Sequence, residues 1–265
     1  SVMHPILFRI GSFEVGTYGL LLALGFFAAL ALAMRQGKKD ALAPEALSDL
    51  SVTVLIAGVV GSKLLMIVVD LINGGTLAQV FDFATLRAGG AVHGGIILGM
   101  AAFFWRVRKW KLPMAATLDA LVPAMALGQA IGRLGCFSAG CCYGTECHLP
   151  WAVTFTNPDA HVFSGTPLLQ ALHPVQLYTF LVELAIVGVL VLLRRRRAFP
   201  GQIAGVFFIL EGLSRSILEI WRGDLDRGIW LGLPWLSTGR LTGMFFILFG
   251  IGLWWWFRRR QAVEA

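Results

Sequence analysis

Residues 50–72 read LSVTVLIAGVVGSKLLMIVVDLI, a nearly uninterrupted apolar run. A helix needs about 20 predominantly apolar residues to cross the hydrocarbon core of a bilayer. The whole chain shares this character: 57% of its 265 residues are hydrophobic and 14% are charged, whereas soluble domains average about 25% charged residues. The mean hydropathy is +0.75. The composition therefore predicts an integral membrane protein and excludes a water-soluble domain.

Working outward from this run, the chain shows about seven apolar segments of spanning length. We expect an all-α bundle of transmembrane helices that forms a single domain over residues 1–265. Glycines at 58 and 61, and at 94, 95 and 99, predict close helix contacts. The predicted spans are 17–34, 50–72, 90–106, 115–135, 175–193, 202–221 and 239–257.

The positive charges predict the orientation of the bundle. Most of the 22 Lys and Arg residues lie in four clusters beside apolar segments, at 35–39, 106–111, 194–197 and 258–260. Cytoplasmic loops carry such an excess, so the N-terminus is expected outside and the C-terminus in the cytoplasm. The same distribution argues against a nucleic-acid partner despite the net charge of +7. The outer segments 136–173 and 223–236 are then expected to form a head or lid.

Arg133 is the first candidate for chemistry, in the stretch GRLGCF at 132–137. An arginine beside hydrocarbon is expensive to maintain, and the surrounding glycines can expose backbone N–H groups to an anion. We expect it to bind a lipid phosphate. The alternative is an arginine that snorkels from a helix end.

A second group stands in the segment 202–221 and just beyond it. Arg215, Glu219 and Arg222 are spaced four and three residues apart, and Glu211 extends the same helix face. The group predicts a phosphate-binding arginine oriented by a carboxylate, or a structural row of ion pairs. His93, flanked by glycines, is a candidate general base or a buried structural histidine.

Four cysteines follow Arg133, at Cys136, Cys141, Cys142 and Cys147. Small buried residues or a disulfide-stapled loop are the favoured interpretations, with a catalytic thiol as a lesser one. Because the spacing lacks a C-x-x-C pair, a zinc site is a minor alternative. No metal and no cofactor are expected.

Together these residues resemble the prolipoprotein diacylglyceryl transferase family. The matching positions run in family order over most of the chain, and the segment 132–144 is the most specific. They are Tyr18-Gly19, Arg87, His93-Gly94-Gly95, Asp119, Gln129 to Gly135, Gly144, His173-Pro174, Gln176-Leu177-Tyr178, Arg215 and Glu219.

The resemblance implies a reaction in the bacterial cytoplasmic (inner) membrane. The diacylglyceryl group of phosphatidylglycerol moves to the thiol of the lipobox cysteine in a preprolipoprotein signal peptide, and glycerol phosphate leaves. By similarity, His93, Arg133 and Arg215 are catalytic. The phospholipid-binding positions are Tyr18, Asp119, Arg133, Gly144, Arg215 and Glu219.

The chain departs from the commoner family pattern at four positions. One is Thr179, which stands where that pattern often has Glu, and Glu183, one turn later, is a candidate substitute. Cys136 and Ala139 stand where that pattern has Asn, and Cys141 stands where it has Glu. The chain thus resembles a cysteine-bearing variant, and no role of those polar side chains carries over. Two other functions stay open at this point: a secondary transporter, and a membrane thiol oxidoreductase that uses the outer cysteines.

Overall fold

The structure is a computed structural model that describes residues 6–10, 13–74, 91–223 and 237–264. The chain divides into two compact units, one of Ser1–Gln36 with Leu118–Ala265 and one of Gly37–Thr117. The expectation of a single domain stays a prediction.

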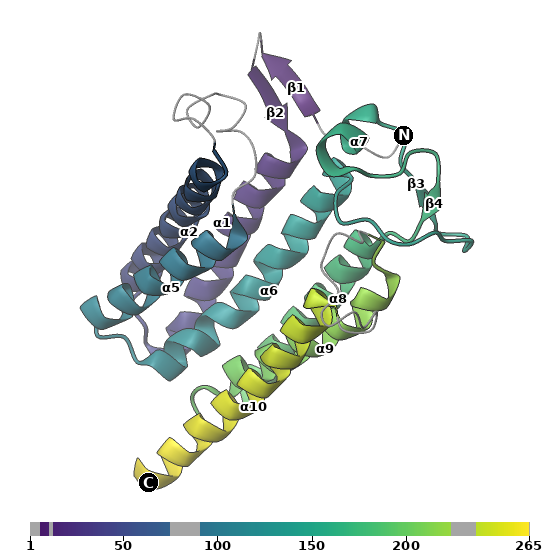
Figure 1. The fold of residues 1–265 in the computed structure, drawn as a ribbon. Coiled ribbons are helices and arrows are strands. Elements are labelled where there is room, and N and C mark those ends of the chain that lie inside the picture. The colour runs from purple at the N-terminus through teal and green to yellow at the C-terminus, as the bar shows by residue number, and fades with distance from the viewer. Residues whose placement is uncertain (1–5, 11–12, 75–90, 224–236, 265) are drawn as a thin grey trace. The chain divides into compact units, whose positions relative to one another are not determined.

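Five helices provide most of the larger unit (Figure 1). They are α1 (Thr17–Gly37), α6 (Met114–Ala139), α8 (Val175–Leu193), α9 (Gln202–Leu218) and α10 (Thr238–Glu264). Short 3-10 turns follow α8 and α9, at η2 (Arg194–Arg196) and η3 (Glu219–Trp221).

The core of this unit is built by α6, α8 and α9. Side chains from all three helices pack into one cluster that is almost fully buried: Val122, Ala126, Ile186, Leu190, Ile203, Ala204 and Phe207. Helix α10 packs along α9 through glycines. A Cβ at Gly212 would strike the backbone oxygen of Gly243, and one at Gly205 would crowd the helix near Gly250. Small residues therefore allow the two backbones to approach closely.

Small folded elements stand at the ends of these helices. The N-terminal hairpin pairs β1 (Ile6–Ile10) with β2 (Phe13–Gly16) and leads into α1. Between α6 and α8, the chain forms α7 (Pro158–Ser164) and the antiparallel pair β3 (Val153–Thr154) and β4 (Ala171–Leu172). This region between α6 and α8 has a small hydrophobic core of its own, formed by Phe155, Ala160 and Leu172. The predicted outer segment 136–173 is therefore a folded module rather than a bare loop, and these strands modify the all-α expectation.

The smaller unit is a helix pair, α2 (Pro44–Ile72) and α5 (Val92–Lys109). A Cβ at Gly61 would strike the backbone of Gly94, and the reverse also holds. The predicted glycine contact is confirmed here. Arg106 secures the pair with an ion pair of 3.1 Å to Asp49 and a hydrogen bond of 3.0 Å to Thr53.

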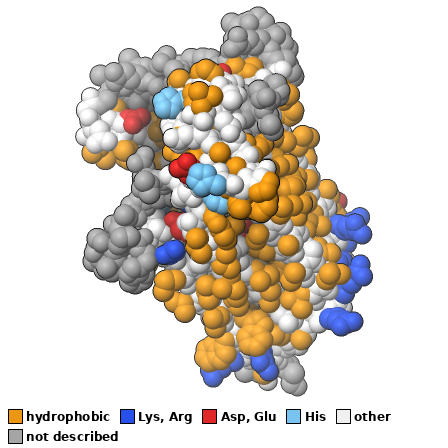
Figure 2. Space-filling view, turned by 90° about the vertical axis from the view of Figure 1, so that its right-hand side faces the viewer, with side chains coloured by type: hydrophobic (Ala, Val, Ile, Leu, Met, Phe, Trp, Pro, Cys, Tyr) orange, Lys and Arg blue, Asp and Glu red, His pale blue; other side chains and the backbone are white. Residues whose placement is uncertain are grey.

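Within the described residues, five helices are long and apolar enough to cross a membrane, by length and composition: α1, α2, α6, α8 and α10. Helices α5 and α9 occupy two further predicted segments, 90–106 and 202–221. Figure 2 shows hydrophobic side chains spread over much of the face of the molecule that it views. Phe27, Ile97 and Leu248 are each more than half exposed, at 65%, 68% and 68%. Apolar surface of this extent suits lipid, and the chain is a mostly helical, multi-pass membrane protein.

Candidate functional site

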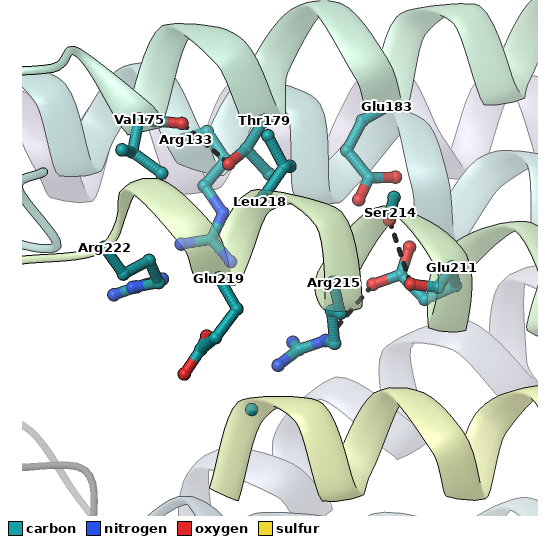
Figure 3. A pocket seen from close by; sticks show the side chains of 11 residues that line it. Arg133, Val175, Thr179, Glu183, Glu211, Ser214, Arg215, Leu218, Glu219 and Arg222 are labelled. Atoms are coloured by element: carbon teal, nitrogen blue, oxygen red, sulfur yellow. Dashed lines mark hydrogen bonds and ion pairs between the residues drawn. The ribbon is translucent and has the colours of Figure 1, made fainter. Parts of the chain in front are cut away.

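A polar pocket opens among the helices of the larger unit. It combines three arginines with three glutamates, on helices whose other side chains are mostly apolar. Figure 3 shows these side chains converging from α6, α8, α9 and the turn after α9. The lining residues are Arg133, Val175, Thr179, Glu183, Glu211, Ser214, Arg215, Leu218, Glu219, Arg222 and Gly239.

The pocket brings together three predicted site residues that are far apart in the sequence. Arg133 comes from the last turns of α6, Arg215 from α9, and Glu219 from the turn η3. Arg222, which ends η3, adds a third cation. Guanidinium groups pair with two phosphate oxygens at once, so the arrangement suits a phosphate better than a single cation would.

Arg215 forms an ion pair with Glu211, one helical turn earlier. The distance from Nε to Oε1 is 3.5 Å, and the Glu211 side chain is only 3% exposed. The Nε–H is not aligned for a hydrogen bond, so the contact is electrostatic and leaves the guanidinium donors available. The predicted row on one helix face is confirmed for this pair.

Glu183 of α8 faces Glu211 across the pocket. Each of the two carboxyl groups keeps one buried oxygen without a hydrogen-bond partner among the described residues. Sequence reasoning gave Glu183 little weight. A lone carboxylate inside the apolar segment 175–193 was the available signal, because ionisable groups inside spans are rare and functional.

Glu219 is held from the opposite side by α10. Ser237 Oγ donates a hydrogen bond of 2.7 Å to Glu219 Oε1, and the same Oγ accepts the backbone N–H of Arg240 at 3.2 Å. Gly239 leaves room for the carboxylate, since a Cβ there would strike it. Sequence reasoning missed Ser237, which lies just after an undescribed segment.

Gly144 lies beside the pocket rather than in its lining. Its N–H donates to the backbone oxygen of His173 at 3.1 Å, and Thr145 N–H donates to Trp221 O at 2.9 Å. A Cβ at Gly144 would strike the backbone oxygens of both His173 and Trp221. The glycine thus allows the module after α6 to pack against the segment that carries Arg222, and so helps to position that arginine.

The segment His173-Pro174-Val175-Gln176-Leu177-Tyr178 ties the same module to α8. His173 Nδ1 lies 3.1 Å from the Tyr178 hydroxyl, which also accepts a hydrogen bond of 2.8 Å from Trp151 Nε1. Gln176 Nε2 donates to the backbone oxygen of Cys141 at 2.8 Å. The segment therefore fixes the start of α8 and the chain between 141 and 151 relative to one another.

Asp119 lies away from the pocket lining. Its carboxylate is fully buried and accepts hydrogen bonds from Gly201 N and Ala204 N, at 2.8 and 2.9 Å, and from Arg197 at 3.1 Å. These contacts cap the N-terminus of α9, where backbone N–H groups lack helical partners. Asp119 and Arg133 are separated by about 21 Å along α6 at 1.5 Å per residue. The predicted role of Asp119 in phospholipid binding stays a prediction.

Two other predicted residues also lie outside the lining. Tyr18, at the start of α1, packs on Gly135 and lies within electrostatic reach of Arg133. His93 lies on α5 in the smaller unit, where it is exposed. Arg87 falls in a segment outside the described residues. Roles for all three stay predictions.

The cysteines after Arg133 are free thiols, so the described structure contains no disulfide. The Sγ atoms of Cys136, Cys141 and Cys142 all lie within 4.8 Å of one another. Hydrogen bonds from the other two thiols, and then the charges of Arg222 and Arg133, lower the pKa of the Cys142 thiol. The convergence was not foreseen, because spacing along the chain does not reveal that α6 ends at Ala139 and the backbone reverses there.

Comparisons with known proteins show the family of this chain. The family described as prolipoprotein diacylglyceryl transferase matches residues 5–256. A phosphatidylglycerol–prolipoprotein diacylglyceryl transferase of Clostridium tetani is 32% identical over 94% of this chain and 96% of its own length. Proteins of the same name from Gloeobacter violaceus and Pseudomonas aeruginosa are 30% and 28% identical, over 98% and 99% of this chain and 96% of their own lengths. The chain belongs to the prolipoprotein diacylglyceryl transferase family.

Proposed function

We propose that this protein transfers the diacylglyceryl group of phosphatidylglycerol to the thiol of a lipobox cysteine in a preprolipoprotein. A thioether forms and glycerol phosphate is released, which is the first step of lipoprotein maturation. One observation carries the proposal: the pocket places Arg133, Arg215 and Arg222 together inside a bundle of membrane helices. The names of the relatives supply the substrates.

The arginines suit the leaving group. The sulfur attacks the glycerol carbon that is bonded to a phosphate oxygen, so the C–S bond forms as the C–O bond breaks. The phosphate gains negative charge in the transition state, and a fixed guanidinium stabilises that charge without reorganisation. One such donor typically lowers a barrier by roughly 3–4 kcal/mol. Arg133 and Arg215 are the assigned donors, with Glu219 and Glu211 orienting them.

The nucleophile belongs to the protein substrate. A free thiol has a pKa of about 8.5, so little of it is thiolate at neutral pH. His93 is proposed as the base that accepts its proton, because histidine is the side chain that most often acts as a general base. Tyr18, Asp119 and Gly144 complete the proposed phospholipid site.

Both substrates reside in the bilayer, so they enter between helices rather than from water. We place the protein in the bacterial inner membrane with seven spans, the N-terminus outside and the C-terminus in the cytoplasm. The clusters Arg194 to Arg197 and Arg258 to Arg260 then face the cytoplasm. The segment 136–173 covers the pocket from outside. Most of its proposed companion, 223–236, lies beyond the described residues.

A defined assay tests the proposal. The purified protein in detergent receives phosphatidylglycerol and a lipobox peptide, and mass spectrometry follows the peptide. We expect a mass gain equal to one diacylglyceryl group on the cysteine peptide and none on the matched serine peptide. A labelled substrate that accumulates in vesicles without any modified peptide would instead identify a transporter.

A further inference from the structure

The three-cysteine cluster has the geometry of a metal site. Its Sγ atoms lie within 4.8 Å of one another, and all three side chains are partly buried. In a tetrahedral zinc site with Zn–S bonds of about 2.3 Å, neighbouring sulfurs lie about 3.8 Å apart. Closing the cluster on an ion therefore needs small side-chain movements only. Among the residues that the structure describes, the group has three members, which leaves a fourth tetrahedral position open.

The backbone that carries the three cysteines is held in place by hydrogen bonds from side chains elsewhere in the chain. Thr166 Oγ1 donates to the backbone oxygen of Gly140, and Gln176 Nε2 donates to that of Cys141, each at 2.8 Å. Both donors are buried, at 0% and 1% exposure. Cys142 adopts a left-handed conformation with φ of 60°, which costs a non-glycine residue about 1–2 kcal/mol. A turn held in this way presents its thiols in a preset arrangement, as a metal site requires.

The cluster also lies within electrostatic reach of two arginines that line the pocket. Arg133 precedes Cys136 by three residues on α6, so the two share a helix face. The charges of Arg133 and Arg222, which both line the pocket, reach Cys142. Three thiolates around Zn²⁺ carry a net charge of −1, and these two cations offset it.

We propose that Cys136, Cys141 and Cys142 bind a Zn²⁺ ion whose open fourth position takes the lipobox thiol of the substrate. This inference rests on the proposed function. Catalytic zinc sites typically have three protein ligands and one exchangeable position, whereas structural zinc sites have four protein ligands and no open position. A thiol that coordinates zinc loses its proton. The zinc site thus supplies the thiolate that the transfer needs, at a position next to the arginines that hold the phosphate.

The step balances without an oxidant or reductant. The substrate thiol binds zinc and gives its proton to His93, the base of the proposed function. Its sulfur then forms a bond to the glycerol carbon, while the bond from that carbon to the phosphate oxygen breaks. The electron pair leaves with glycerol phosphate, which takes up a proton from solvent according to its own pKa. The thioether product is a weaker zinc ligand than a thiolate, so it can depart.

Metal content is the first test. The full-length protein is purified without chelators, its metals are measured by mass spectrometry, and zinc is titrated into the apoprotein against a chromophoric chelator. We expect about one zinc ion per chain in the wild type and none in the Cys136→Ser/Cys141→Ser/Cys142→Ser variant. Cys147→Ser is the matched control, because Cys147 lies outside the cluster, and it should bind zinc like the wild type.

Cobalt reports on the open position without relying on turnover or on a variant that folds. Co²⁺ in the wild-type site should show sulfur-to-cobalt charge-transfer absorption, and a lipobox cysteine peptide should intensify it while the serine peptide does not. Equal zinc binding by the wild type and the triple variant, a disulfide within the cluster, or a spectrum indifferent to the thiol peptide would each overturn the zinc site.

The rate of peptide modification with and without zinc distinguishes a failure of the zinc site from a failure of the proposed transferase activity. Removing zinc should slow peptide modification roughly 100-fold, the scale of a lost acid–base contribution, and added zinc should restore it. If the zinc-free protein modifies the peptide at the full rate, the zinc proposal fails and the transferase proposal stands. If the zinc-loaded protein binds the thiol peptide but never modifies it, the transferase proposal fails instead.

Discussion

Two buried acidic sites in the larger unit look alike in composition but differ in how completely they are satisfied. Asp119 receives two backbone N–H groups and Arg197, all within 3.1 Å. Glu211 has one ion pair of 3.5 Å to Arg215. Glu183 and Glu211 each keep an oxygen without a hydrogen-bond partner among the described residues. Native proteins leave few buried polar atoms unpaired, and those that remain call for an explanation.

This difference in hydrogen bonding separates charged groups that stabilise the fold from charged groups that are available to bind a ligand. The Asp119 site is complete, so it stabilises the start of α9. The site around Glu211 is incomplete, because the buried Nε of Arg215 has no hydrogen-bond partner among the described residues, and a phosphate oxygen can accept from that donor. Substitutions at the two sites should therefore separate stability from activity.

The largest effect is expected for Arg133→Ala. Loss of a guanidinium that stabilises the departing phosphate should lower the transfer rate by roughly 100- to 1,000-fold, with little change in the melting temperature. Initial rates of peptide modification and thermal unfolding in detergent measure the two quantities. Arg195→Ala, at an exposed arginine of η2, is the control and should retain the wild-type rate. A similar loss in both variants would contradict a specific role for Arg133.

Asp119→Asn should act mainly on stability. The fully buried carboxylate loses its charge beside Arg197 and beside two N–H groups at a helix end, which should lower the free energy of unfolding by about 3 kcal/mol. Thermal unfolding checks this, and the Michaelis constant for phosphatidylglycerol shows whether lipid binding changes as well. An unchanged melting temperature with a raised Michaelis constant would support the binding role that the family resemblance implies.

Gly144→Ala tests how the module after α6 positions Arg222. The new Cβ would meet two backbone oxygens, so we expect a loss of about 2 kcal/mol in unfolding free energy together with a lower transfer rate. Gly188→Ala on α8 is the control, since a Cβ there meets nothing within 4 Å. Equal melting temperatures for the two variants would show that the backbone near 144 relaxes freely.

The smallest effect is expected for Glu211→Gln. It removes the charge that pairs with Arg215 while keeping the shape of the side chain, so the arginine should be less well oriented and the rate should fall about tenfold, near 1.4 kcal/mol. Stability should hold or rise slightly, because one of two adjacent buried carboxyl groups becomes neutral. A large decrease in the free energy of unfolding would show that Glu211, like Asp119, mainly stabilises the fold. The proposed difference between the two sites would then be wrong.

Sequence patterns predicted the helices and part of the site for physical reasons that operate locally. Apolar length located the helices, and helical spacing placed Glu211 and Arg215 on one face. The glycines at 61 and 94 marked a close contact, because only small residues permit one. The family resemblance linked Arg133 to Arg215, which local patterns cannot do.

The features that sequence reasoning missed depend on contacts between distant segments or on a reversal of the backbone. Asp119 reaches Gly201 only because α6 packs against the start of α9. Glu183 becomes a site residue only when α8 faces α9. The cysteines meet because the chain turns back after Ala139, and spacing along a single segment does not encode that turn.

The proposed function requires the arginines of the pocket to bind the phosphate of phosphatidylglycerol. Native mass spectrometry of the detergent-solubilised protein measures this directly, by comparing retention of phosphatidylglycerol with that of diacylglycerol of the same acyl chains. We expect the wild type to retain phosphatidylglycerol preferentially. The Arg133→Ala/Arg215→Ala variant should lose this preference while its melting temperature stays unchanged. Equal retention of the two lipids by the wild type, or an undiminished preference in the double variant, would contradict this expectation.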